Sequence, residues 1–434
     1  MSTAILTTLP NGLRIALQPM PSTYSASLVI LVGVGSRYEE EAEAGASHFL
    51  EHMLFKGTTR RPNAQIIADA LERVGGRFNA STSRETTTYY TKVPYMHSAL
   101  GLDVLADMLR CSLLDPVEVE REKGVILEEL AQGEDVPTTV GAHLLQKTVW
   151  GDHPLGRPII GSRETIGAVD AAALRGYRDN AYVPEHMVVS VAGNIDPEDV
   201  VRQVETLFGD LPAAAGRAAP PAAYPTDATP MALARRDGQA HLYLSGRGVP
   251  VDHPDQMALA IMGDILGGGM TSRLFREVRE RRGLAYAVAA SASSMADHGS
   301  LGVHAGVAPA KAVDALGVIM DEIEKLGTVV IEDDEIERVR GHYEGSMLLA
   351  LEDSYAVASR NGRSVLQRGY IRTPEESLAL VEKVTKDDVR RVAATVVRSG
   401  ALRLSVVGPF DSSDEFAPVL ARFGHDEGAV SAAR

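Results

Sequence analysis

The chain has 434 residues, of which 45% are hydrophobic and 23% charged, and its formal net charge is −15. This composition is ordinary for a globular protein, and the length exceeds what one hydrophobic core normally serves, so we expect at least two domains. The negative charge argues against nucleic acid as a partner and favours neutral or cationic ligands. The single cysteine, Cys111, cannot form an internal disulfide, which suggests a reducing compartment.

No targeting or membrane segment is evident from the sequence. The N-terminus lacks a basic region followed by a long apolar run, so we expect no signal peptide. No stretch approaches the roughly 18 uninterrupted apolar residues that would indicate a membrane span. We therefore expect a cytoplasmic protein.

The first expected elements are two strands and a helix. Residues 7–18 alternate in polarity about an Asn11-Gly12 turn, which predicts a β-hairpin. Residues 25–34 form an apolar, β-rich run that predicts a buried strand. After an acidic run, residues 46–58, ASHFLEHMLFKGT, are expected to form a helix.

This predicted helix carries an H-x-x-E-H motif made of His48, Glu51 and His52. Residues three and four apart share one face of a helix, so two imidazoles and one carboxylate point into one arc. A catalytic zinc needs nitrogen ligands and a base beside its water, and this reversed order is a zinc-peptidase signature. We expect Ser47 to cap the first turn of the helix and Gly57 to end it.

Helices and strands continue through the rest of the first half. Residues 63–74 have helical periodicity, residues 78–93 are dense in β-branched and aromatic side chains, and residues 96–114 are again helical in pattern. We expect the middle segment to be one long strand. A carboxylate-rich helix is predicted to open at Pro116, and residues 187–193 predict a core strand.

A linker is expected at residues 211–231, which consist mostly of proline, alanine and glycine without a helical or strand period. It separates a predicted catalytic, zinc-binding half at residues 1–210 from a second half at residues 232–434. The second half repeats the plan of the first. Residues 241–249 resemble the first apolar strand, and residues 255–269 stand where the motif helix stands.

The third zinc ligand is expected from the carboxylate-rich helix, because a catalytic zinc usually has three protein ligands and a water. Glu122 and Glu129 are seven residues apart and share one face, which we expect Val125 and Ile126 to bury. A buried carboxylate needs a partner, and a cation supplies one. We take Glu129 as the ligand and Glu122 as the carboxylate that orients a histidine, whereas Glu128 faces elsewhere.

The second half lacks all of these groups. In our alignment of the two halves, Leu259, Met262 and Gly263 stand opposite the three motif residues. Val339 and Ser346 stand opposite the two glutamates. We expect an α+β fold of two homologous α/β halves, each a mostly antiparallel sheet flanked by helices, with the second half acting as a wall over the site of the first.

Simpler interpretations stand beside the zinc site. A glutamate-rich helix is more often a solvated surface, and a histidine pair at this spacing often binds no metal. The carboxylate between the two histidines, on the same arc of the helix, favours the metal interpretation.

The residues named so far resemble those of the pitrilysin family of zinc peptidases, in particular the half-length branch that includes the mitochondrial processing peptidase β subunit and bacterial processing peptidases. The resemblance covers most of the chain and includes LPNGLRIAL, ASHFLEHMLFKGT, NASTSRETTTYY, EREKGVILEEL, PLGRPIIG and GGGMTSRLFREVRERRGLAYAV. It implies a pitrilysin/LuxS-like metallopeptidase architecture, one Zn²⁺ per chain, and endopeptidase activity on extended peptides or presequence-like segments.

The resemblance also implies roles for individual residues. It matches the third zinc ligand to Glu129 and the preceding family glutamate to Glu122. An R-x6-Y pattern in the second half matches Arg279 and Tyr286, a pair that in the family reaches the scissile carbonyl. Without the family, Arg279 would be interpreted as a solvated charge on a cationic helix.

The same comparison implies how substrate is bound and cleaved. Asn79 and Ala80 match an edge strand that pairs with the substrate backbone, although alone Asn79 would indicate a turn at a strand entry. Glu51 is expected to act as general base and to return the proton to the leaving amine. Tyr286 and Arg279 are expected to stabilise the oxyanion.

The chain is half the size of full-length members of that family, so we expect a homodimer, with a heterodimer with a related subunit left open. The partners expected are peptide substrates, and neither nucleic acid nor a membrane. The negative charge favours basic peptides, although an acidic surface can also serve solubility alone. Two rival interpretations remain: a non-catalytic scaffold subunit of a processing peptidase complex, and an enzyme that hydrolyses other amides with the same ligands.

Overall fold

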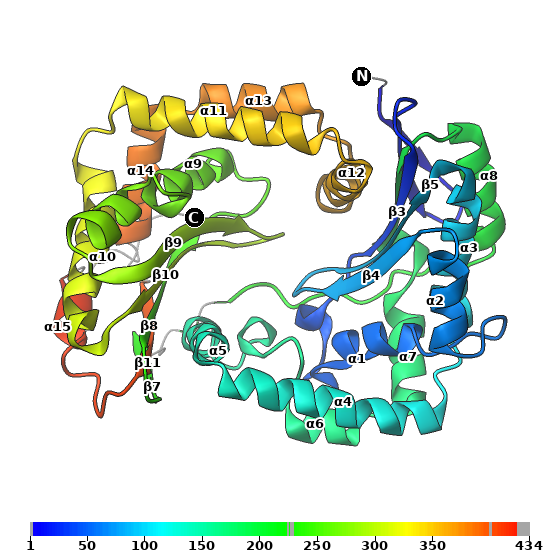
Figure 1. Ribbon diagram of the computed structural model, residues 1–434, viewed down its shortest axis with the longest axis horizontal. Helices are drawn as coiled ribbons and strands as arrows, with labels where there is room; N and C mark the ends of the chain where they lie inside the picture. The colour runs from blue at the N-terminus through cyan, green and yellow to red at the C-terminus, as the bar shows by residue number, and fades with distance from the viewer. Residues whose placement is uncertain (1–2, 224, 226–229, 399–401, 423–434) are drawn as a thin grey trace. The chain divides into compact units, whose positions relative to one another are not determined.

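The computed structural model describes all residues except 1–2, 224, 226–229, 399–401 and 423–434. The chain divides into two compact units, each described here by itself. Unit 1 consists of Met1–Ala131, Arg157–Pro220 and Ser346–Thr373. Unit 2 consists of Gln132–Gly156, Pro221–Gly345 and Pro374–Arg434. Each unit is a sheet with helices on both faces (Figure 1).

The sheet of unit 1 has six strands in the order β1-β2-β6-β3-β5-β4. Its strands are Ile5–Thr8 (β1), Arg14–Pro19 (β2), Ser25–Val32 (β3), Arg77–Thr82 (β4), Thr87–Pro94 (β5) and Met187–Gly193 (β6). All neighbouring strands are antiparallel except β2 and β6, which are parallel. Strand β4 therefore lies at one edge of the sheet.

One face of this sheet is covered by a group of helices that encloses the main core of the unit. They are Ala46–Leu54 (α1), Ala64–Glu72 (α2), Ser98–Cys111 (α3), Arg163–Ala168 (α6), Ala171–Ala181 (α7) and Pro197–Phe208 (α8). Leu28 and Ile30 of the sheet pack in one cluster with Phe49 and Leu50 of α1. The helix Pro116–Asp135 (α4) contributes Val119 and further apolar residues to the same cluster.

The sheet of unit 2 repeats this topology with five strands in the order β7-β11-β8-β10-β9. Its strands are Met231–Arg235 (β7), Ala240–Gly248 (β8), Ala285–Ser294 (β9), Gly299–Val307 (β10) and Arg403–Gly408 (β11). The β7–β11 pair is parallel, as β2–β6 is, and the other pairs are antiparallel. The strands match those of unit 1 in order and direction, which confirms the expected internal repeat.

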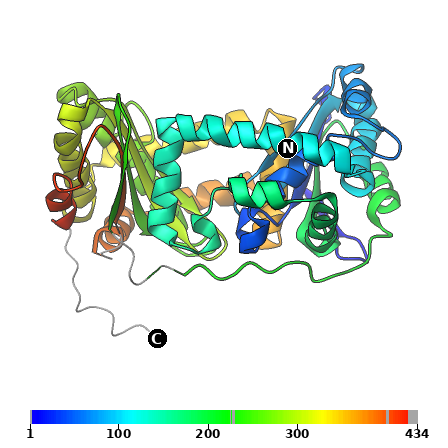
Figure 2. The ribbon, with the colours of Figure 1, turned by 90° about the horizontal axis from the view of Figure 1, so that it is seen from below.

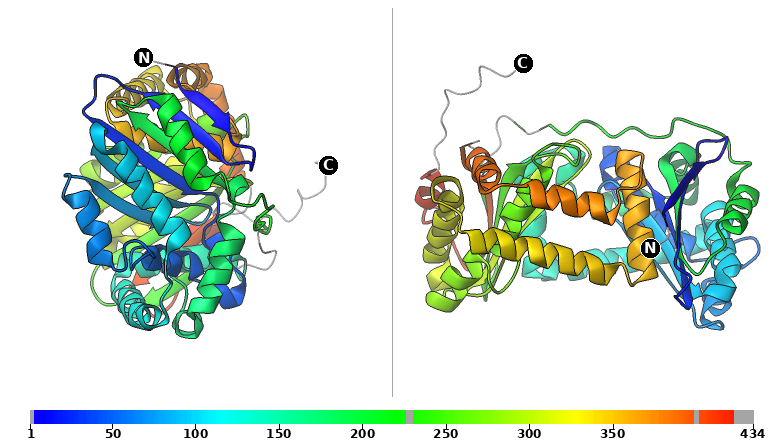
Figure 3. Two further views of the ribbon diagram at one scale, coloured as in Figure 1. Left: turned by 90° about the vertical axis from the view of Figure 1, so that its right-hand side faces the viewer. Right: turned by 90° about the horizontal axis from the view of Figure 1, so that it is seen from above.

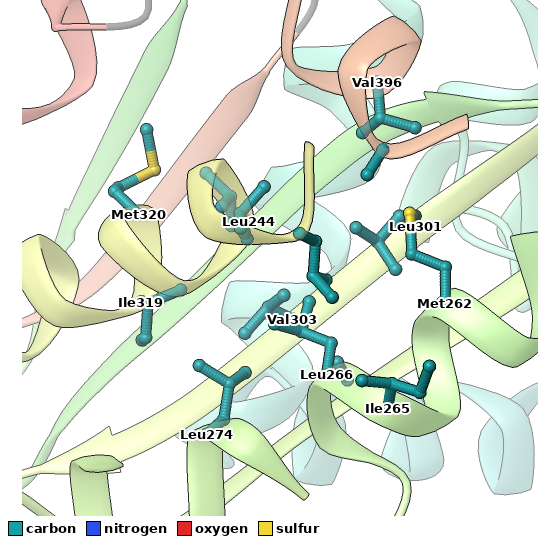
Figure 4. Packing of buried hydrophobic residues seen from close by; sticks show 14 of the residues in the cluster. Leu244, Met262, Ile265, Leu266, Leu274, Leu301, Val303, Ile319, Met320 and Val396 are labelled. Carbon is teal, nitrogen blue, oxygen red and sulfur yellow. The ribbon is translucent and has the colours of Figure 1, made fainter. Parts of the chain in front are cut away.

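The core of unit 2 lies between this sheet and a second group of helices. Figure 4 shows Val303 of β10 beside Leu266 of α9, and Leu244 of β8 in the same group of buried side chains. The helices and the π-helical segment of this half are Gln256–Gly267 (α9), Phe275–Arg281 (η6), Ala312–Thr328 (α10), Asp333–Ala350 (α11), Pro374–Lys383 (α13), Lys386–Arg398 (α14) and Ala417–Ala421 (α15).

The opposite face of each sheet is covered by a helix from the other half of the sequence. Helix Pro137–Trp150 (α5) packs on β8 and β11 of unit 2 (Figure 2), and Ser354–Arg368 (α12) packs on β2, β3 and β6 of unit 1 (Figure 3, right). In each case a buried sheet serine donates to a helix carbonyl at 2.7 Å: Ser405 to Gly141, and Ser190 to Ala358. The two units therefore do not coincide with the two halves of the sequence. The chain passes from unit 1 to unit 2 within α4, and from unit 2 to unit 1 within α11.

Most of the strand and helix predictions agree with these bounds, but one is wrong. Strands β1 and β2 form the expected hairpin with Gly12 in a left-handed conformation, and β6 spans the expected core strand. The expected long strand at residues 78–93 is instead two strands, β4 and β5. A turn held by the Ser83 side chain and backbone, both bonded to Thr86, separates them without glycine or proline.

The predicted linker has neither helix nor strand at residues 211–223, 225 and 230, and its positions 224 and 226–229 lie outside the described residues. Its predicted last residue is wrong by one, because Met231 already begins β7. None of the described helices combines the length and apolar composition needed to cross a lipid bilayer.

The close approach of α12 to the sheet predicts that Gly362→Ala destabilises unit 1. A Cβ at Gly362 would overlap the Leu31 side chain and lie 2.9 Å from Cβ of Ser190. Overpacking of this kind costs roughly 1–3 kcal/mol. Gly176→Ala in α7 is the matched control, because a Cβ there meets nothing within 4 Å and removes chain entropy from the unfolded state. Urea unfolding should show the first variant less stable than the second; equal midpoints would contradict the packing argument.

Candidate metal centre

The apolar side of helix α1 packs into the core of unit 1, and its polar side carries the residues of the candidate site. Phe49, Leu50, Met53 and Leu54 are buried in the core of unit 1. His48, Glu51 and His52 project from the remaining arc and are half-buried. Spacings of three and four residues on a helix place these three side chains together, as the motif predicted.

The N-terminus of α1 is fixed by a side chain outside the helix. The buried carboxylate of Glu39 accepts hydrogen bonds from the amides of Gly45, at 2.8 Å, and Ser47, at 2.7 Å. These are amide groups that a helix leaves without internal partners. The prediction that Ser47 caps the helix is wrong: Gly45 is the N-cap residue, and the Ser47 hydroxyl bonds the Tyr177 hydroxyl at 2.6 Å. The helix ends at Leu54, before Gly57.

The carboxylate of Glu129 reaches both imidazoles from α4. Its Oε1 lies 3.8 Å from Nε2 of His48, and its Oε2 lies 3.7 Å from Nε2 of His52. One donor atom from each residue lies within 4.8 Å of the others. Among the described residues, Nδ1 of His48 is buried without a hydrogen-bond partner.

These donors fit a zinc ion. Zn–N and Zn–O distances of about 2.0–2.2 Å in tetrahedral geometry separate ligand atoms by roughly 3.3–3.5 Å, slightly less than the spacing here. Burial, with a smaller contribution from the neighbouring His52, lowers the pKa of His48 to about 4, so the ring is neutral at neutral pH. A metal ligand must be in that unprotonated form.

Glu122 holds the imidazole of His52 in place through a hydrogen bond. Its Oε1 lies 2.9 Å from Nδ1 of His52, and its Oε2 lies 2.5 Å from Nζ of Lys56. Glu122 is buried together with Val119 and Ile126 on the inner face of α4. The ring of His52 is therefore oriented with Nε2 toward Glu129, and the ammonium of Lys56 compensates the buried negative charge. The expectation that Val125 shares this buried face is wrong, since its side chain is 51% exposed.

Glu51 lies beside the two imidazoles and accepts a hydrogen bond from the edge strand. The hydroxyl of Thr82, the last residue of β4, donates to Oε2 of Glu51 at 2.5 Å. Burial, the largest cause, raises the pKa of Glu51, and the Thr82 hydroxyl opposes that shift. A carboxyl group with a raised pKa beside a candidate metal centre is suited to taking up a proton.

The remaining predicted residues lie on three elements: β4, the π-helical segment η6 and β9. Asn79 and Ala80 are on edge strand β4, paired with Tyr90 and Tyr89 of β5, and Oδ1 of Asn79 accepts from the Ala80 amide at 2.9 Å. In unit 2, the Arg279 guanidinium lies 4.8 Å from the ring centre of Phe275 and 5.2 Å from that of Tyr286. Tyr286 is 78% exposed, so its hydroxyl is available to a ligand.

Three residues of this site escaped sequence reasoning. Lys56 belongs to the motif stretch itself and could have been found as the position one turn after His52. Thr82 could have been found only by recognising that β4 ends there. Glu39 gives no local signal, because it stands outside the helix that it caps.

The sequence matches two family descriptions in succession. Residues 14–163 match "Insulinase (Peptidase family M16)", and residues 168–342 match "Peptidase M16 inactive domain". A protein of Streptomyces coelicolor described as an uncharacterized zinc protease is 42% identical over 410 residues, which cover 93% of this chain and 89% of the relative. A Bacillus subtilis protein with the same description is 37% identical over 386 residues, 89% of this chain and 94% of the relative.

Solved structures show the same fold. The crystal structure of a protease from Helicobacter pylori is similar with a TM-score of 0.87 at 23% identity, covering 94% of this chain and 99% of that one. A structure from Pseudomonas fluorescens described as a peptidase M16 inactive domain has a TM-score of 0.88 at 18% identity, with coverage of 95% and 99%. These likenesses confirm the two-part α+β fold.

The burial of Glu39 predicts a pH-dependent stability. Burial raises the pKa of Glu39 from 4.5 to about 7, against the opposing effect of the two amide hydrogen bonds. The folded state therefore holds this proton more tightly than the unfolded state. Stability should be lost as pH rises from about 4.5 to about 7 and stay flat above, by ~3 kcal/mol at 1.36 kcal/mol per pKa unit.

Glu39→Gln cannot ionise and is the comparison that isolates this effect. Urea unfolding of both proteins between pH 4.5 and pH 8 should show the wild type losing stability relative to the variant over that interval. A wild type that gains stability relative to Glu39→Gln as pH rises would mean that the amide hydrogen bonds outweigh burial.

Proposed function

Because the chain belongs to the M16, or pitrilysin, family of zinc peptidases, we propose that it is a zinc-dependent endopeptidase that cleaves extended peptides or presequence-like segments. The observation that carries this proposal is the convergence of His48, His52 and Glu129 beside the carboxylate of Glu51. Two imidazoles, one carboxylate and an adjacent base are the parts that metal-assisted amide hydrolysis requires.

We assign the ion to His48, His52 and Glu129, with Glu122 orienting His52. When bound, zinc supplies a Lewis acid that polarises the scissile carbonyl and makes a water more acidic. Glu122 holds the tautomer of His52, since an acceptor on Nδ1 fixes the proton there and leaves Nε2 free as a ligand.

Glu51 is the general base in this proposal. Its carboxylate takes a proton from the attacking water and passes it to the leaving amine nitrogen, so the residue returns to its starting state after each turnover. The burial that raises its pKa matches a group that must first accept and then release a proton. The hydroxyl of Tyr286 and the guanidinium of Arg279 are proposed to donate to the developing oxyanion.

The substrate is proposed to bind as an added strand on β4. An edge strand offers main-chain groups to an extended peptide, and such pairing tolerates varied side chains. Asn79 and Ala80 lie on that strand, which ends at the residue bonded to Glu51. The net charge of −15 supports a preference for basic peptides.

A non-catalytic partner subunit is the second candidate function, and one finding favours it: residues 168–342 match a domain described as inactive. That stretch lies outside the metal centre, and all four residues of the centre are present in the other part of the chain. We therefore prefer the catalytic function.

The assignment of Glu51 predicts that Glu51→Gln retains zinc and fold but loses peptidase activity by at least about a hundredfold, as expected on removal of a general base. Glu129→Ala should instead lose the ion. Glu128→Gln, at an exposed neighbouring position of α4, is the control and should behave as wild type. Zinc content by atomic emission and cleavage of a peptide library, with and without chelator, measure these effects. Full activity of Glu51→Gln would refute the assigned base.

The proposed homodimer predicts complementation between two inactive variants if Tyr286 serves the metal centre of another copy. Tyr286→Phe should lower kcat by about 10²–10³-fold through loss of an oxyanion donor. When the Tyr286→Phe and Glu51→Gln chains are co-expressed, half of the dimers should contain one chain of each kind. Each such hybrid has one complete site of two, so about a quarter of the wild-type activity should return. Chain mass by light scattering checks the association. An associated pair without recovered activity would contradict the sharing of sites.

A further inference from the structure

Glu51, the proposed general base, lies on one element and accepts a hydrogen bond from another. Glu51 stands on α1, and the hydroxyl that donates to its Oε2 belongs to Thr82 at the end of β4. In the described part of the chain, no hydrogen bond is formed by the other oxygen of this carboxylate, Oε1. One oxygen is therefore anchored and the other is open to a proton.

The anchoring matters because a glutamate carboxylate is otherwise poorly fixed. Its terminal torsion is broad and nearly two-fold, so a half-buried glutamate without a donor samples several orientations of its oxygens. A base must lie within about 3 Å of the proton that it takes, and a displacement of about 1 Å can cost a hundredfold in rate. A single donor on Oε2 selects one orientation.

Thr82 is itself held in place. It pairs with Thr87 of β5, and the buried Thr87 hydroxyl donates to the carbonyl of Val34 at 2.9 Å. Helix α1 packs against β4, so the two elements that carry the hydrogen bond are in direct contact. Thr82 lies two residues after Ala80, on the same strand that is proposed to bind the substrate backbone.

We propose that Thr82 is a positioning residue that orients the Glu51 carboxylate and ties it to the substrate-binding edge strand. This inference rests on the proposed peptidase function. The hydroxyl of Thr82 donates to Oε2, leaves Oε1 directed to the reacting water, and keeps the base in register with the peptide that pairs with β4. Thr82 does not touch the substrate's reacting atoms, so its effect appears in kcat rather than in KM.

The test compares Thr82→Val, which removes the hydroxyl at nearly constant shape, with Thr82→Ser, which keeps it. In zinc-loaded full-length protein, Thr82→Val should lower kcat about tenfold with KM and zinc content within twofold of wild type. Thr82→Ser should restore most of kcat. Thr88→Val, on the neighbouring strand β5, is the matched control for loss of a threonine hydroxyl. Thr82→Ala serves if the valine variant folds poorly.

A double-mutant cycle separates positioning from general damage. If Thr82 acts through Glu51, then adding Thr82→Val to Glu51→Gln should leave the residual rate unchanged, whereas independent effects would multiply. A multiplied loss, or an unchanged kcat in Thr82→Val alone, overturns the inference.

A measurement independent of activity keeps the two hypotheses apart. Crystal structures of the zinc-loaded wild type and Thr82→Val should show the Glu51 carboxylate in one place in the former and rotated or divided between conformers in the latter. An unmoved carboxylate overturns the positioning role even if the wild type cleaves peptides. A wild type that binds zinc but cleaves no peptide refutes the proposed function, while the crystal structures still decide the role of Thr82.

Discussion

A single nine-residue helix has to satisfy two opposite demands, and the rest of unit 1 is arranged to meet them. The buried side chains of Phe49, Leu50, Met53 and Leu54 fix the rotation of α1 about its axis, and Glu39 fixes its N-terminal end through two amide hydrogen bonds. Once rotation and position are set, the remaining arc can hold three polar side chains in a constant orientation. A rotation of α1 by one residue would move His48 and His52 into the buried positions of Phe49 and Met53.

The site is then completed by charges that balance one another in a partly buried setting. Glu122 is buried, and its carboxylate is paired with the ammonium of Lys56 and hydrogen-bonded to the ring of His52. Glu129 is half exposed and faces two imidazoles that present no formal positive charge when neutral. A divalent ion between these three donors would supply the missing charge, which is why the cluster is understandable as a metal site and less so as a salt bridge. Two glutamates of α4 therefore differ by their burial: Glu122 is buried and orients His52, whereas Glu129 is half exposed and is the candidate ligand.

The sequence was sufficient to place the motif residues on one helix and to find the internal repeat, because these depend on helical spacing and on similarity between the halves. Spacing alone left Glu129 open, and its choice as a ligand depended on the family resemblance. It was insufficient where a partner is distant along the chain. Thr82 bonds Glu51 across 31 residues, and no local pattern announces that contact. The turn at Ser83–Thr86 was missed since serine and threonine side chains hold it without the usual glycine or proline. The packing of α5 on the sheet of unit 2, and of α12 on the sheet of unit 1, was missed. Helical periodicity does not indicate which sheet a helix covers.

The repeat also bears on the candidate metal residues. Unit 2 has the same strand order and directions as five strands of unit 1, yet at the positions aligned with the histidines it has Leu259 and Gly263. Leu259 is fully buried, and its helix α9 packs on β9 as α1 packs on β4. This arrangement is therefore stable with apolar side chains where unit 1 has imidazoles. Half-buried histidines and a carboxylate are costly in such a layer, so their presence in unit 1 is explained by chemistry rather than by folding.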